Sequence, residues 1–110
     1  MATKKKTAPV LEEFAGINND MIAELSDYMD YYGITSGKAL SKADKAAFHR
    51  DARMLVIEMC YDQSTMLLAI AACTNAEERY TKTEDYETAG NLYFVGNLIA
   101  QRYDEIHPKY

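Results

Sequence analysis

The feature that most constrains the fold of this chain is a twenty-residue apolar block, residues 54–73, with one polar island at its centre. The island comprises residues 62–65 (DQST), and Glu58 stands one helical turn before it. A surface helix shows one apolar stripe, whereas a helix that is apolar on nearly all sides is buried on several of them. The block must therefore be covered on more than one side, by the rest of the chain or by copies of it.

The apolar block does not meet the requirements of a membrane-spanning helix. Such a helix needs about 20 apolar residues with few or no charges, and a carboxylate at mid-bilayer costs a few kcal/mol. Glu58 and Asp62 lie inside the block. The first ten residues, MATKKKTAPV, carry charge but no apolar segment, so they do not resemble a secretory signal. We therefore predict a protein that makes no membrane contact.

Length and cysteine usage indicate one small domain in a reducing compartment. The 110 residues, 48% of them hydrophobic, leave room for a basic arm at residues 1–9 and one all-helical domain at residues 10–110. Cys60 and Cys73 fall within one predicted helix, which separates them by roughly 20 Å, beyond the reach of a disulfide. Two free, buried thiols are typical of a cytoplasmic protein, and this is the predicted localisation.

Helical spacing of apolar residues predicts an N-terminal helix over about residues 20–32. Asn18 or Asn19 is a suitable N-cap, and Gly33 suits the left-handed conformation that ends many helices. Upstream of this helix, two glutamates that follow a proline predict a short helical turn, which Gly16 ends.

Two longer helices are predicted over the rest of the chain. Ser41 and Asp44 resemble a capping box, and the helix that they start is expected to run from about residue 42 to 80. Any break in it is expected at residues 74–75. Thr83 then caps a last helix over about residues 84–107. Because the turn between the helices is short, they must run antiparallel as a helical hairpin.

The first long helix shows a stripe in which residues recur about every three and four positions. Its members are Phe48, Ala52, Leu55, Met59, Asp62, Met66, Ala69, Cys73, Ala76 and Tyr80. All but one are apolar or aromatic, which is typical of coiled-coil-like packing. We therefore predict an all-α fold, with coiled-coil-like packing of the hairpin, that is completed by oligomerisation.

The exception on this stripe is Asp62. An unpaired carboxylate at a buried position would cost several kcal/mol. We expect it to pair with Arg50, Arg53 or Arg102, or to accept hydrogen bonds from hydroxyl groups such as that of Thr65. A buried polar residue on such a stripe can also fix the register and number of helices in an oligomer. Asp62 is therefore predicted to lie in the subunit interface.

Further interface candidates come from glycine and tyrosine. Gly90 and Gly96 each cost about 1 kcal/mol in a helix relative to alanine, which is typical where a second backbone comes close. The chain has nine tyrosines and no tryptophan, and tyrosine is favoured at protein interfaces. The predicted interface tyrosines are Tyr28, Tyr31, Tyr32 and Tyr103. That the first three simply cap a small core is the open alternative.

Charge is segregated along the sequence. Residues 10–33 contain six acids and no base, whereas residues 34–56 contain five bases and two acids. Such segregation favours the pairing of helices within a fold or between subunits. The basic arm contains three lysines, whereas the rest of the chain carries a net charge of −8. This balance disfavours nucleic acid as a partner.

These observations predict a non-enzymatic structural, assembly or accessory protein that acts through contacts with itself and with another protein. No catalytic residue, metal or cofactor is assigned, and composition of this kind is common among bacteriophage proteins. One alternative is an inhibitor that occupies a basic site on a nucleic-acid enzyme, with an acidic, tyrosine-bearing face formed by Asp20, Glu24, Asp27 and Asp30. A second alternative is a carboxylate-metal helical-bundle enzyme built around Glu58, Asp62 and a histidine.

Overall fold

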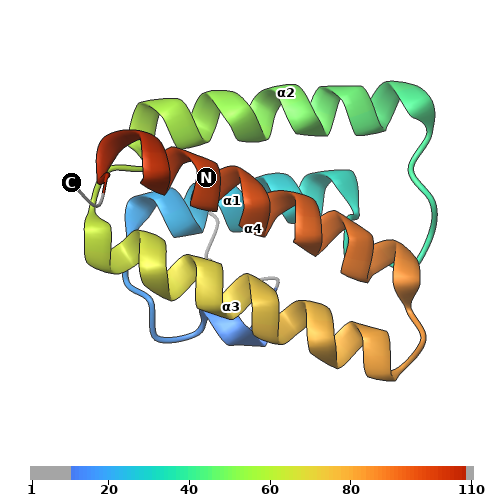
Figure 1. The fold of residues 1–110 in the computed structure, drawn as a ribbon. Coiled ribbons are helices and arrows are strands. Elements are labelled where there is room, and N and C mark those ends of the chain that lie inside the picture. Colours follow the sequence, from blue (N-terminus) through green and yellow to red (C-terminus); the bar gives the residue numbers. More distant parts are fainter. Residues whose placement is uncertain (1–10, 109–110) are drawn as a thin grey trace, which may run out of the picture.

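A computed structural model describes residues 11–108, which form an all-helical arrangement (Figure 1). A 3₁₀ turn is followed by four α-helices: η1 (Glu12–Phe14), α1 (Asp20–Tyr32), α2 (Lys42–Met59), α3 (Gln63–Lys82) and α4 (Tyr86–Ile106). The predicted all-α class is confirmed. The basic arm predicted at residues 1–9 lies outside the described residues.

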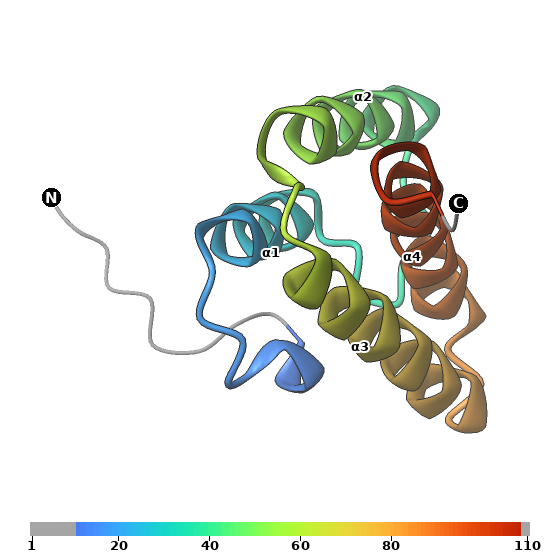
Figure 2. The same ribbon diagram turned by 60° about the vertical axis from the view of Figure 1, so that its left-hand side comes forward.

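Helices that follow one another in the chain run in opposite directions (Figure 1). α3 packs against α4 as the antiparallel hairpin that the sequence predicts, α1 packs against α2, and α2 also contacts α4. The 3₁₀ turn η1 lies against α3. Figure 2 shows α1 between α2 and α3. Coiled-coil-like packing and completion by oligomerisation stay predictions.

The prediction of one helix over residues 42–80 is wrong, because the helix is interrupted at residues 60–62. α2 ends with Met59, and α3 begins after Asp62, whose side chain accepts a hydrogen bond from the Thr65 backbone N–H at 2.8 Å. The polar island thus consists of Asp62, which is the N-cap of α3, and the residues 63–65 of the first helical turn that follows it. The break expected at residues 74–75 is also misplaced, since α3 passes through them without interruption.

The other predicted helix ends are mostly confirmed. Asn19 accepts hydrogen bonds from the backbone N–H groups of the two residues that follow Asp20, at 2.8 and 3.3 Å, and Gly33 ends α1 in the left-handed conformation at φ 68°. Ser41 accepts from the Asp44 backbone N–H at 3.1 Å. Thr83 is not the cap of the last helix.

The start of α4 is set by Asp85, not by Thr83. Thr83 ends α3, and its hydroxyl donates to the Tyr80 carbonyl at 3.0 Å. The Asp85 side chain accepts from the Thr88 backbone N–H at 3.2 Å, so that α4 begins at Tyr86. A carboxylate competes well with a hydroxyl for this role, because it is charged and lies at the positive end of the helix dipole.

The core takes apolar side chains from all five elements. The predicted stripe is largely buried, including Phe48, Ala52, Leu55, Met66, Ala69, Cys73 and Ala76. Met59 and Asp62 depart from this prediction: 37% of Met59 is exposed, and Asp62 is exposed as well. Both stand at the break, where the stripe no longer follows a helix.

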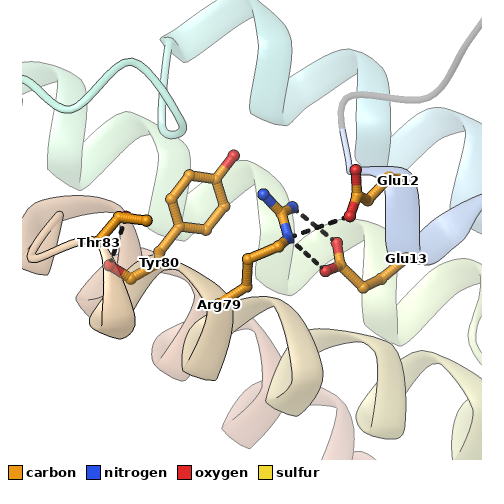
Figure 3. A network of polar contacts seen from close by, with 5 residues as sticks. All are labelled: Glu12, Glu13, Arg79, Tyr80 and Thr83. Carbon is orange, nitrogen blue, oxygen red and sulfur yellow. Dashed lines mark hydrogen bonds and ion pairs between the residues drawn. The ribbon is translucent and has the colours of Figure 1, made fainter.

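An ion pair fixes η1 to α3 (Figure 3). The Arg79 guanidinium donates to both carboxylate oxygens of Glu13, at 2.6 and 2.9 Å, and lies 3.4 Å from Glu12. It also stacks over the Tyr80 ring, with 4.5 Å between the guanidinium carbon and the ring centroid. The bonds from Arg79 lower the pKa of Glu13, and the carboxylate raises the pKa of Arg79.

We predict that Glu13→Gln lowers the free energy of unfolding by about 1 kcal/mol at neutral pH, near the low end for charge-assisted bonds because Arg79 is partly exposed. The folded-state pKa of Glu13 lies below its ordinary value of 4.5. Its contribution is therefore complete above that value and disappears as the pH falls through the folded-state pKa. Urea unfolding of both proteins at several pH values checks this; a difference that persists unchanged at low pH would contradict it.

The two glycines of α4 have different surroundings. A Cβ atom added at Gly96 would lie 3.3 Å from the Cβ of Cys73 on α3, so the close approach expected there is made within the chain. Gly90 is exposed, and no atom lies within 4 Å of the position that its Cβ would take. Among the described residues, no close contact requires a glycine at position 90.

We expect Gly90→Ala to raise the free energy of unfolding by about 1 kcal/mol, because alanine gains helix propensity and meets no obstacle. Gly96→Ala gains the same propensity but crowds Cys73, so its net effect should be smaller or destabilising. Urea unfolding followed by circular dichroism measures both. An equal gain in the two variants would show that α3 and α4 are not closely packed at Gly96.

Candidate interaction surfaces

The structure brings the three tyrosines of α1 together at a shallow, open hollow. Tyr28, Tyr31 and Tyr32 line it with Asp27 of the same helix and Asp51 of α2, and its volume is about 380 Å³. The tyrosines stand at helical spacing, so the sequence predicts their common side. The contribution of α2 could not be foreseen, because Asp51 comes from a helix that packs against α1.

Tyr32 is the residue that joins the two walls of the hollow. Its hydroxyl donates to Asp51 Oδ2 at 2.6 Å, and Arg50 Nε lies 3.3 Å from Asp51 Oδ1. The Tyr32 ring meets the Tyr31 ring edge-on, with centroids 4.9 Å apart and an interplanar angle of 85°. The hydrogen bond to Asp51, together with burial, raises the pKa of Tyr32 to about 12.

The tyrosines divide between core and surface. Tyr28 and Tyr32 are partly buried and pack against the core, so both share in capping it. Tyr31 differs, because 80% of it is exposed. A role in an interface therefore stays a prediction for all three, and Tyr31 is the one whose ring is free of the core.

The four predicted acidic residues of α1 are all exposed, and their role in binding stays a prediction. Asp20, Glu24 and Asp27 recur at spacings of four and three, which places them on one stripe that leads to Tyr31. Asp30 follows three residues after Asp27, at the outer edge of this stripe, and is exposed as well. The stripe therefore reaches the hollow, which Asp27 lines.

α2 carries a second apolar face that the sequence analysis did not identify. Met54 and Ile57 are 53% and 56% exposed, although both belong to the central apolar block. They lie at helical spacing, on the side of α2 away from the buried Phe48 and Ala52. Residues at the same spacing form what we call the outer face of α2: Ala43, Ala47, Arg50, Met54 and Ile57. This second stripe was detectable in the sequence, but the buried stripe of the same helix concealed it.

Asp62 does not take the place that the sequence predicts. It is exposed and serves as the N-cap of α3, and the pKa of its carboxyl is lowered chiefly by the hydrogen bond from the Thr65 backbone N–H. Of the expected arginine partners, Arg50 pairs with Asp51, and Arg102 donates to the Ile57 carbonyl at 3.2 Å. The expectation of a buried carboxylate paired with an arginine is wrong, whereas the expected contact with Thr65 is made. A place for Asp62 in an interface stays a prediction.

Tyr103 connects two helix ends within the chain. Its hydroxyl accepts a hydrogen bond from Gln63 Nε2 at 2.8 Å, which ties the end of α4 to the start of α3. Its ring lies 5.3 Å from that of His107, whose Nε2 is 2.8 Å from the Tyr61 carbonyl oxygen. These contacts account for Tyr103 within the chain, and its role between subunits stays a prediction.

The residues of the metal alternative are not arranged as one site. Glu58 belongs to α2, whereas Asp62 lies beyond the end of that helix and bonds to α3, so the two do not share a helix face. Among residues 11–108, no group of three or more histidine, cysteine, aspartate or glutamate side chains is placed to hold a metal ion.

Both cysteines are free and buried. Burial raises the pKa of the Cys60 thiol to about 11 and that of Cys73 to about 12. Because the thiolate is the reactive form, neither residue is activated as a nucleophile at neutral pH. The prediction that one helix holds both cysteines is wrong, because Cys60 follows α2 and Cys73 lies in α3.

None of the helices described between residues 11 and 108 is long and apolar enough to span a membrane. Comparison with protein families, curated proteins and solved structures finds no match for this chain.

We predict that Asp62→Leu lowers the midpoint of thermal unfolding, because the first backbone N–H groups of α3 lose their acceptor. Asp62→Asn should leave the midpoint nearly unchanged, since asparagine caps helices about as well as aspartate. Circular dichroism at neutral pH measures both midpoints. If the two variants lose equal stability, the charge of Asp62, and not its capping bond, is what matters.

Proposed function

We propose that this chain is a non-enzymatic assembly or accessory protein that acts in the cytoplasm through protein–protein contacts, and that it associates with a second copy of itself through the outer face of α2. The observation that carries this proposal is the incomplete cover of the central apolar block. Met54 and Ile57 stay more than half exposed, although the solvent side of a surface helix is ordinarily polar.

The outer face of α2 has the form that a symmetric pair requires. In a two-fold dimer the same surface of both subunits must be complementary to itself. In an antiparallel pair centred on Met54, the Met54 side chains of the two copies meet at the two-fold axis. Burial of the exposed Met54 and Ile57 side chains then supplies the hydrophobic driving force.

Charge on α2 favours the antiparallel orientation. Arg50 and Glu58 stand four residues before and four residues after Met54, so all three lie on one side of the helix. In an antiparallel pair centred on Met54, Arg50 of each copy faces Glu58 of the other, and this contact occurs twice. Both residues are exposed. Complementary charges of this kind set orientation and register.

A charge-reversal experiment tests this arrangement. Arg50→Glu and Glu58→Arg should each weaken dimerisation about tenfold or more, because each creates two like-charge contacts. The double variant Arg50→Glu/Glu58→Arg should restore it, since the pairs reform with exchanged signs. Sedimentation velocity over a range of concentrations, supported by native mass spectrometry, gives the association constants.

Lys38→Glu is the matched control, because it makes the same change of charge at an exposed loop position outside α2. Circular dichroism verifies that each variant keeps its helix content. A chain that is monomeric at all concentrations, or a double variant that stays as weak as the singles, would overturn the proposed dimer.

A further inference from the structure

We propose that the tyrosine hollow of α1 and α2 binds the cationic side chain of a lysine or arginine, presented by a basic segment of a partner protein. The hollow is defined by Asp27, Tyr28, Tyr31, Tyr32 and Asp51. This proposal does not depend on dimerisation through α2, because it starts from a different group of side chains.

The aromatic walls provide the first part of the recognition. A cation is attracted to the face of a tyrosine ring within about 6 Å of its centroid. Because Tyr31 and Tyr32 meet edge-on at 85°, their ring faces are turned in different directions, and Tyr28 adds a third ring to the lining. Rings of this kind also cover the methylene groups of a lysine or arginine side chain.

Hydrogen bonding provides the second part. Tyr32 donates its only O–H to Asp51, so its oxygen can only accept a further bond. With a pKa raised to about 12, Tyr32 stays protonated at neutral pH and keeps this arrangement. An ammonium or guanidinium group has donors and no acceptors, and therefore matches it.

Charge on the α1 side of the hollow favours a cationic ligand. The hollow has two carboxylates: Asp27 on the α1 side, and Asp51 on the α2 side, whose charge Arg50 partly offsets. Asp20 and Glu24 extend the same negative stripe along the helix. Residues 10–33 contain six acids and no base, so the α1 side of the hollow attracts a basic segment along the helix.

The shape of the hollow favours a segment of protein over a free small molecule. Ligand pockets enclose most of a small molecule, whereas this hollow is shallow and open to solvent. An open hollow suits a side chain that arrives with its own backbone, which can then lie along the acidic stripe. A peptide with several basic residues fits both features at once.

The test uses a fluorescently labelled peptide of sequence MATKKKTAPV, which is the basic arm of this chain. The full-length protein carries Lys4→Gln, Lys5→Gln and Lys6→Gln, so that its own arm does not compete. Fluorescence anisotropy measures the Kd. Tyr31→Ala should raise the Kd about fivefold, whereas Tyr31→Phe should leave it unchanged, because phenylalanine keeps a ring face for the cation.

Matched controls separate the hollow from general attraction. Tyr93→Ala removes a tyrosine that is 58% exposed on α4, and Asp104→Asn removes an exposed charge on the same helix; neither residue lines the hollow. Tyr93→Ala should leave the Kd unchanged, and Asp27→Asn should raise it more than Asp104→Asn does.

Three results would overturn the proposal. The first is equal weakening by Tyr31→Ala and Tyr93→Ala, and the second is equal weakening by the two aspartate variants, which would indicate unspecific charge attraction. The third is equal binding of a peptide in which glutamine replaces all three lysines. Because Tyr31 is 80% exposed, its replacement should not disturb the fold, which circular dichroism verifies. Sedimentation velocity on the same variants reports separately whether the α2 dimer is kept.

Discussion

The arrangement of this protein depends on the hydrogen bond between the Asp62 carboxylate and the Thr65 backbone N–H, at the start of α3. This bond caps α3 where the chain reverses at residues 60–62, and the two halves of the apolar block become α2 and α3. α1 then lies between them, as Figure 2 shows. The cost of this solution is that α2, packed on one side only, keeps a second apolar face in solvent.

The sequence was sufficient for the helical class and for most helix ends, because caps act locally: Asn19, Gly33 and Ser41 each work through backbone groups within a few residues. The apolar pattern of the sequence led to a wrong prediction at residues 60–62, where α2 ends and α3 has not yet begun. Met59 and Met66 keep a spacing of seven across residues 60–62, so the apolar pattern continued where the helix did not. The capping signal of an aspartate before a polar turn was present in the sequence, but the longer pattern outweighed it.

The candidate surfaces were predictable only where one helix forms them. The tyrosines of α1 and the stripe of Asp20, Glu24 and Asp27 follow from helical spacing alone. The partner of Tyr32 is Asp51, 19 residues further along the chain, and no local rule places the two together. The contact partner of Gly96 could not be predicted from the sequence either, because Cys73 approaches it through the packing of α3 on α4.

The ion pair between Glu13 and Arg79 joins residues that are 66 positions apart, whereas the α3–α4 hairpin brings near neighbours in the chain together. Contacts that close long loops cost more entropy and form later in folding than local ones. We therefore infer an order of assembly: the C-terminal hairpin forms first, and η1 attaches to it last. Interactions made after the rate-limiting step slow unfolding and leave the folding rate unchanged. If the pair forms in this order, the Glu13–Arg79 bonds lower the rate of unfolding and leave the rate of folding nearly unchanged.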